Sequence, residues 1–132
     1  MALSLTLRQR RLERVNEEQK QAAKIAAWLD VDVIVGRPEV RLLVRNSSDA
    51  SISLFRAHIR DRTQPSAPPT TIEINGVPPT GVPLVRATGL RLPPHTEDLV
   101  YWVDAIEFRD FRFRRWELGQ KGLRQLKKAE NT

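Results

Sequence analysis

The first thirty residues carry an apolar pattern with the period of an α-helix. Neither proline nor glycine interrupts residues 5–29, and good helix formers such as arginine, glutamate, alanine and leucine dominate this stretch. Thr6 and Gln9 have the spacing of a capping box, in which the two side chains satisfy free backbone donors at a helix N-terminus. The pattern therefore predicts a helix over residues 6–29, about 36 Å long at about 1.5 Å per residue.

The predicted helix changes character along its length. Its first half is charged with a narrow apolar side, whereas residues 22–29 are apolar nearly all round. A heptad seam joins both halves and comprises Leu5, Leu12, Val15, Ala22, Ala26 and Leu29. We expect the second half to pack on its own domain and the first half to associate with another chain through Leu5, Leu12 and Val15. A helix that lies wholly along its own sandwich is the alternative.

From residue 31 onward the apolar period shortens to two, which is typical of β-strands. Short runs of alternating apolar and polar residues are separated by turn-forming residues at frequent intervals. The predicted strands cover residues 31–35, 40–45, 52–59, 71–74, 85–92, 99–103, 106–109 and 113–118. In the third of these, Ile52, Leu54, Ala57 and Ile59 carry the apolar pattern, with an irregularity expected near Arg56. Residues 46–49 are a predicted turn, and residues 123–128 fit either a strand or a short helix.

About seven short strands without crossover helices indicate an antiparallel sandwich, because parallel strands need a long connection between them. With 132 residues the chain is long enough for one core but not for two. We therefore predict a mainly β protein, in which an N-terminal helix (residues 1–30) precedes an immunoglobulin-like β-sandwich (residues 31–132). The prolines between residues 65 and 83 are interpreted as stiffeners of loops and sheet edges.

Charge is concentrated at the two ends of the chain. Residues 1–30 carry six basic and four acidic side chains, residues 31–104 carry eight of each, and residues 105–132 carry eight basic and four acidic ones. The net charges of the three segments are +2, 0 and +4, which sum to the +6 of the whole chain. Basic ends can attract nucleic acid, an anionic membrane or an acidic protein, or can act only as solvated surface.

Motifs for catalysis or cofactor binding are not found in the sequence. Cysteine is absent, which excludes disulfides, thiolate metal sites and cysteine nucleophiles. The two histidines, His58 and His95, have no metal-ligand or catalytic spacing, and no phosphate-binding loop or nucleophile-elbow motif occurs. We expect a protein that is not an enzyme and takes no cofactor or metal. With no apolar run of membrane-spanning length and no secretory signal, the expected location is cytoplasmic.

The segment from Phe108 to Trp116 interleaves four aromatic side chains with four arginines. In a terminal hairpin, Phe108, Phe113 and Trp116 would fill the core while the arginines face water. Phe111 would then be exposed at the turn, where an aromatic ring can contact a partner protein. Arginine and aromatic side chains also bind single-stranded nucleic acid; the candidate phosphate contacts are Arg8, Arg10, Arg11, Arg112, Arg114 and Arg115.

Three short motifs carry a resemblance to a known class of domains. They are residues 43–49 (Leu-Val-Arg-Asn-Ser-Ser-Asp), residues 92–94 (Leu-Pro-Pro), and residues 108–110 (Phe-Arg-Asp) followed by Arg115-Trp116. Over residues 30–118 the chain resembles a loose class of small immunoglobulin-like domains of actinobacterial proteins. In that class the last motif flanks a tight turn, often with a glycine that this chain replaces by Phe111, Arg112 and Phe113. The resemblance implies the fold and a preceding helix, but no activity.

These observations predict a protein-interaction or assembly module. The predicted contacts are Leu5, Leu12 and Val15 on the helix and Phe111 at the turn, and the partner is a second copy of the chain or another protein. The alternative is a nucleic-acid-associated accessory protein that uses its basic ends. An enzyme would need a ligand pocket that the sequence does not show.

Overall fold

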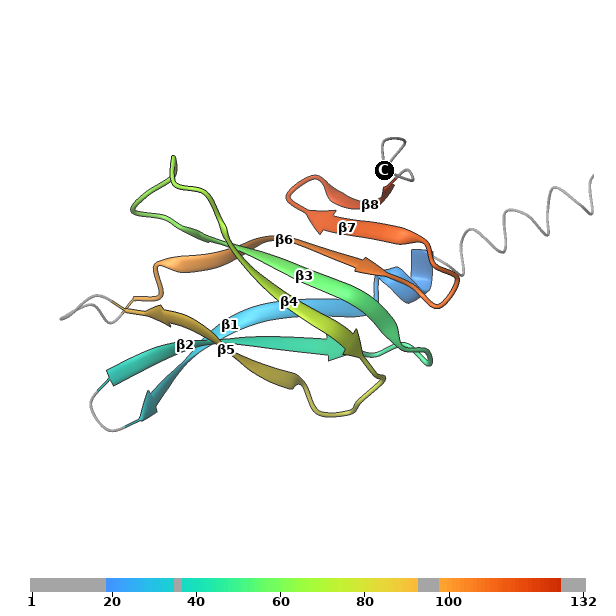
Figure 1. Ribbon diagram of the computed structural model, residues 1–132, viewed down its shortest axis with the longest axis horizontal. Coiled ribbons are helices and arrows are strands. Elements are labelled where there is room, and N and C mark those ends of the chain that lie inside the picture. The colour runs from blue at the N-terminus through green and yellow to red at the C-terminus, as the bar shows by residue number, and fades with distance from the viewer. Residues whose placement is uncertain (1–18, 35–36, 93–97, 127–132) are drawn as a thin grey trace, which may run out of the picture.

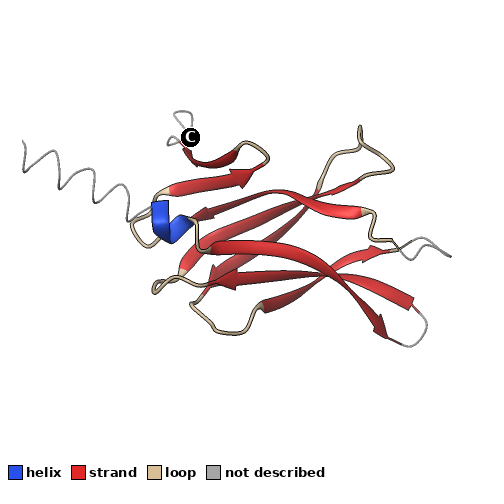
Figure 2. Ribbon diagram, turned by 180° about the vertical axis from the view of Figure 1, so that it is seen from behind, coloured by secondary structure: helices blue, strands red, loops and turns tan. Residues whose placement is uncertain are grey.

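The computed structural model consists of two antiparallel β-sheets that face each other (Figures 1 and 2). It describes residues 19–34, 37–92 and 98–126. One sheet has three strands in the order β1-β2-β5: β1 (Ile25–Ile34), β2 (Arg37–Asn46) and β5 (Leu84–Arg91). The other has five strands in the order β4-β3-β6-β7-β8: β4 (Thr70–Val77), β3 (Ile52–Asp61), β6 (Tyr101–Arg109), β7 (Arg115–Gly119) and β8 (Gly122–Leu126).

The predicted mainly antiparallel β architecture is confirmed, with small changes in the strand list. The two segments predicted at residues 99–103 and 106–109 form the single strand β6. The last segment, which fitted either a strand or a helix, is the strand β8. In the part of the chain that the structure describes, no helix is both long and apolar enough to span a bilayer.

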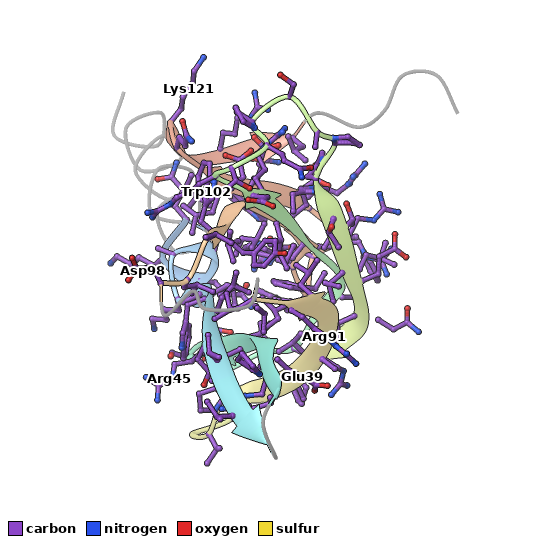
Figure 3. All side chains as sticks on the ribbon, turned by 90° about the vertical axis from the view of Figure 1, so that its left-hand side faces the viewer. Glu39, Arg45, Arg91, Asp98, Trp102 and Lys121 are labelled. Carbon is purple, nitrogen blue, oxygen red and sulfur yellow. The ribbon has the colours of Figure 1, made fainter. Side chains whose placement is uncertain are left out.

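The core lies between the two sheets and is built from alternate residues of the inner strands. Figure 3 looks along the strands and shows side chains filling the space between the layers, while Arg45 and Lys121 point outward. Complete burial of one large apolar side chain stabilises the folded state by about 1.5–3 kcal/mol. The largest buried members of the cluster are Ile25, Leu42, Ile52, Phe55, Ile74, Ile106, Phe108 and Trp116.

The N-terminal segment differs from the predicted helix. Within the described residues the only helix is a single turn at residues 19–22, and β1 begins at Ile25. The prediction of a helix over residues 6–29 is therefore wrong from residue 25 onward, and the predicted domain boundary after residue 30 falls inside a strand. Residues 6–18 of that prediction lie outside the described part of the chain.

Strand pairing explains why the second half of the predicted helix is a strand. β1 pairs with β2 along its whole length, which places Ile25, Ala27 and Leu29 against the core. Ala26 and Trp28 lie on the opposite, outer face of the sheet. A run that is apolar on every side fits both periods, and tertiary pairing outweighs the modest helix preference of alanine and leucine.

A β-bulge interrupts the third strand near its beginning. The pairing of β3 with β6 shifts between Ser53 and Arg56, and Leu54 between them has a positive φ of 49°. Ile52 and Phe55 point into the core, whereas Leu54 is turned out to solvent and is 53% exposed. The predicted irregularity near Arg56 is confirmed, but the apolar alternation through Leu54 is wrong, because the bulge reverses the side on which residues point.

The turn between β2 and β3 is built around a buried amide, and we call it the Asn46 corner. The Nδ2 group of Asn46 donates to the backbone oxygens of Ala50 (2.8 Å) and Val77 (3.0 Å). Its Oδ1 accepts from the backbone N–H (3.0 Å) and the hydroxyl (2.6 Å) of Ser48. This side chain therefore joins the β2–β3 turn to the end of β4. The predicted turn at residues 46–49 is confirmed, whereas its connection to β4 was not predicted.

Candidate interaction surface at the β6–β7 hairpin

The connection between β6 and β7 (residues 110–114) is organised by a buried carboxylate. Its three-residue loop, 111–113, is closed by the hydrogen bond from the N–H of Asp110 to the backbone oxygen of Arg114 (2.8 Å). Asp110 is 2% exposed, and its Oδ1 accepts the backbone N–H groups of Arg112 and Arg114, both at 2.9 Å. Its Oδ2 accepts the indole Nε1–H of Trp116 at 2.9 Å. The backbone oxygen of Asp110 accepts from the N–H of Phe113 (3.0 Å), which closes a turn in which aspartate is favoured at the first position.

Phe113 occupies the backbone position of this loop that glycine normally takes. Its φ is +64°, in the left-handed region, as expected where a turn is followed by a left-handed residue in a three-residue hairpin. A bulky side chain in this region costs about 1–2 kcal/mol. The ring of Phe113 is nevertheless 71% exposed, so core burial does not offset this cost.

Two aromatic rings therefore stand on the surface of the hairpin. Phe111 is 52% exposed, which confirms its predicted position at the turn. The prediction that Phe113 fills the core is wrong, because β7 begins only at Arg115 and the left-handed backbone turns Phe113 away from the sheet. Phe108 and Trp116, the other two aromatic residues of the segment, are buried as predicted.

Each exposed ring is paired with an arginine. The guanidinium carbon of Arg109 lies 4.8 Å from the centre of the Phe113 ring, and that of Arg112 lies 5.3 Å from the centre of the Phe111 ring. Contacts of this kind contribute about 0.5–1 kcal/mol at exposed sites. They hold flat cationic and aromatic groups side by side, and both kinds of group are enriched in protein interfaces.

Arg109, Arg112 and Phe113 border an open groove of about 1130 Å³, which we call the hairpin groove. It lies between the hairpin, the bulge of β3 and the end of β8. Leu54 and Phe113, the two non-glycine residues with a positive φ in the described part of the chain, both line it. The complete lining is Leu54, Arg56, Glu107, Phe108, Arg109, Arg112, Phe113, Arg114, Arg115, Gln125 and Leu126.

Charges on the outer face of this sheet are arranged in two neighbouring rows. Arg109 lies opposite Arg115 in the β6–β7 pairing, and two residues further along each strand Glu107 lies opposite Glu117. Glu117 is bound by Arg124 at 2.8 Å, and Glu107 lies 3.3 Å from a ring nitrogen of His58. The arginine row is therefore the part of this face that an anionic partner can approach.

The structure brings together only some of the residues predicted for binding. Phe111 lies on the hairpin, and Arg112, Arg114 and Arg115 line its groove. The remaining predicted residues lie outside the described part of the chain; they are Leu5, Arg8, Arg10, Arg11, Leu12 and Val15.

Sequence reasoning assigned no binding role to eight of the eleven residues that line the groove, among them Leu54, Arg56, Arg109 and Phe113. The irregular apolar spacing around Arg56 signalled the bulge. The missing glycine in the hairpin signalled the unusual residue at position 113.

The remaining titratable side chains show no catalytic arrangement in the described residues. His58 lies between Thr71 (3.0 Å) and Glu107 (3.3 Å), and Asp104 is bound by Arg60 at 2.9 Å. No group of three or more potential metal ligands occurs among residues 19–34, 37–92 and 98–126.

On the other sheet, Arg41 donates two hydrogen bonds to the carboxylate of Asp30, at 2.8 and 2.7 Å. This bond, together with the nearby charge of Asp32, raises the pKa of Arg41. The hydrogen bonds between Arg41 and Asp30 therefore act as a structural clamp between β1 and β2.

Comparison with known proteins does not indicate a function for this surface. No family model matches the chain, and no curated protein and no solved structure is significantly similar to it. The function must therefore be argued from the hairpin itself.

Proposed function

We propose that this protein is a non-enzymatic interaction module that binds another protein through the hairpin groove. The observation that carries the proposal is Phe113, a large apolar residue that is 71% exposed and holds a left-handed backbone. Glycine at this position would be the better choice for folding alone. A residue that costs stability and is presented to solvent indicates a role outside the fold.

The surroundings of Phe113 support a protein partner. Phe111 and Arg112 stand beside it on the same loop, and Arg109 lies over its ring. Binding energy in protein interfaces concentrates in a few aromatic and arginine side chains near the centre of the contact. Asp110 holds the base of the loop from inside, so binding would order few additional groups.

The proposed fold type is immunoglobulin-like. The support is the strand order, in which the first, second and fifth strands form one sheet and the third, sixth and seventh lie together in the other. The fourth strand pairs with the third here, whereas in the constant-type domain it pairs with the fifth. The similarity to the small actinobacterial class stays a prediction.

The test compares two glycine substitutions of exposed apolar residues. The immobilised full chain captures proteins from the cells of its source, each captured protein is purified, and its affinity is measured by calorimetry. Phe113→Gly should weaken binding at least tenfold, about 1.4 kcal/mol, because it removes a central ring. Val82→Gly, in the loop before β5, removes an equally exposed apolar side chain elsewhere and should leave the affinity unchanged. Equal affinity of both variants and the wild type would overturn the proposal.

Nucleic-acid binding is the second candidate, and the row of Arg109 and Arg115 favours it. Its signature is an affinity for single-stranded oligonucleotide that falls steeply with salt, by about 0.7 logarithmic units for each phosphate contact per tenfold rise in salt. Substitution of Arg115 by glutamine should then reduce the magnitude of that slope by about 0.7. A fluorescence-anisotropy titration at several salt concentrations measures it.

A further inference from the structure

We infer that the hairpin groove binds an acidic peptide segment that carries an apolar anchor. The inference rests on the proposed function, since it names the chemistry of the partner for the same groove. Three features of the groove support it: the charge of its lining, the contacts of Arg109 and Arg115, and the apolar surface beside these two residues.

The lining of the groove is strongly cationic. Five of its six charged residues are arginines, and Glu107 is the exception. The hairpin also contains Asp110, but its carboxylate is buried and accepts three hydrogen bonds from the loop and Trp116. Because that carboxylate is held inside, its oxygens do not compete with a ligand for the arginine donors.

Arg109 and Arg115 have no carboxylate partner within the described part of the chain. The Nε of Arg109 donates to the hydroxyl of Ser53 at 2.9 Å, and its guanidinium stacks over Phe113. These two contacts orient the group and leave four N–H donors on its terminal nitrogens. An oriented guanidinium can bind a carboxylate through two parallel hydrogen bonds. A partner that brings carboxylates to this row gains charge-assisted bonds at little entropic cost.

Apolar surface adjoins the arginine row. Leu126 lies opposite Arg115 in the β7–β8 pairing, and Leu54, Phe108 and Phe113 complete the apolar part of the lining. Leu54 and Phe113 are each more than half exposed, so covering them with an apolar side chain removes two large groups from water. Free acidic residues would leave these groups uncovered, which is why we assign an aromatic or aliphatic anchor to the segment.

The glutamate row favours a short peptide over a nucleic-acid strand. Glu107 and Glu117 lie two residues from the arginines, a distance of about 7 Å at about 3.3 Å per residue. A phosphate chain that extended along the strands would place its next negative charge over Glu107 and Glu117, in a row where Arg124 is already bound to Glu117. A peptide can place its acidic residues over the arginines and neutral residues beyond them.

The experiment selects ligands without assuming their sequence. A phage library of random twelve-residue peptides is panned on the full-length protein, and enriched peptides are synthesised with a fluorescein label. Their dissociation constants are measured for wild type, Arg115→Glu, Phe113→Gly and Arg86→Glu by anisotropy. Arg86→Glu makes the same charge change at an exposed position of β5 in the other sheet. Thermal unfolding of each variant verifies that it is folded.

The expected result is a set of peptides rich in aspartate and glutamate around at least one aromatic or aliphatic residue. Arg115→Glu should weaken their binding at least tenfold, the scale of a lost close charge pair. Arg86→Glu should change it less than about twofold, because exposed charges on the far sheet are largely screened. Replacing the acidic residues of a peptide by glutamine or asparagine should have the effect of Arg115→Glu.

The remaining outcomes distinguish a failure of the acidic partner from a failure of the proposed function. Enriched peptides without acidic residues that are lost in Phe113→Gly would overturn the acidic partner and leave the proposed function standing. Peptides that bind all variants equally, or no enrichment at all, would overturn the proposed function together with this inference. Tighter binding of a labelled twelve-nucleotide oligothymidine than of any peptide would replace the acidic peptide by a nucleic acid.

Discussion

The Asn46 corner and the β6–β7 hairpin are both turns built around a buried polar side chain, but the two side chains have different structural roles. Both lie at the end of the molecule where β3 begins and β6 ends (Figure 1). Asn46 binds the backbone of its own turn and of β4, so its hydrogen bonds hold separate parts of the chain together. Asp110 binds only residues of its own hairpin.

The contrast extends to what each turn exposes. The Asn46 corner presents the small polar residues Ser47 and Asp49 to solvent. The hairpin presents Phe111 and Phe113, one of them on a strained backbone. A buried polar group can therefore stabilise a fold or can hold a rigid support for exposed groups, and the partners of that group distinguish the two roles.

The largest effect is expected from Asn46→Ala. It removes the amide partner of the Val77 oxygen and of the Ser48 N–H in a buried site. The Ala50 oxygen and the Ser48 hydroxyl each lose one hydrogen bond and keep the one that joins them. The free energy of unfolding should fall by about 3–4 kcal/mol, since each unsatisfied buried group costs about 1–3 kcal/mol. Urea denaturation measures it, and the exposed neighbour Ser47→Ala should stay within about 0.5 kcal/mol of wild type. A fall in the free energy of unfolding of less than about 1 kcal/mol would show that the Asn46 corner contributes little to stability.

Asp110→Ala should cost less, about 2–3 kcal/mol, because its partners belong to one hairpin and two of them lie near water once the loop loosens. Asp110→Asn keeps the Oδ1 acceptor and should lose roughly half of that amount, through the Trp116 indole alone. Urea denaturation followed by tryptophan fluorescence reports both values. Equal losses in the two variants would show that the loop amides do not depend on Oδ1.

Phe113→Gly should change stability in the opposite direction. Removing the left-handed backbone strain should stabilise the folded state by about 1–2 kcal/mol. Part of this gain is lost, because the contact with Arg109 disappears and glycine increases the conformational entropy of the unfolded chain. We expect a net gain of about 0.5–1 kcal/mol in the free energy of unfolding. Val82→Gly, whose parent residue is similarly exposed, is the control. A destabilised Phe113→Gly variant would mean that the ring contributes to folding, which would weaken the case for binding.

The smallest effect on stability is expected from the double substitution Leu12→Asp, Val15→Asp, below about 0.5 kcal/mol. Association through the N-terminal segment stays a prediction, and this variant should abolish it while the sandwich remains folded. Light scattering on a sizing column at moderate salt, with absorbance at 260 and 280 nm, compares the variant with wild type. Unchanged assembly of the variant would contradict association through these residues.

The fold was largely predictable because most strands alternate apolar and polar residues. The segment from Ile25 to Leu29 was not, because its apolar residues fit a helix and a strand equally well and only pairing with β2 decides between them. Leu54 was misplaced for a related reason, since a single bulged residue reverses the pattern that follows.

The candidate site was predictable only where it is local in sequence. Phe111 and the neighbouring arginines belong to one short segment, and their placement followed from recognising a hairpin. Phe113 depended on the loop length, because a three-residue loop requires a left-handed residue at its end. Arg56 and Leu54 come from β3, which pairs with β6 only through the order of strands in the sheet, and that order cannot be read from local patterns.

The hydrogen bonds of Asp110 have a consequence for how this surface can diverge. Two of them are made by backbone N–H groups and the third by Trp116, so none depends on the side chains at positions 111–113. Those three positions can therefore be exchanged, by natural drift or by grafting, while the support beneath them is retained. The hairpin can therefore present different side chains on an unchanged support, and substitutions at these three positions can give the same fold a new binding specificity.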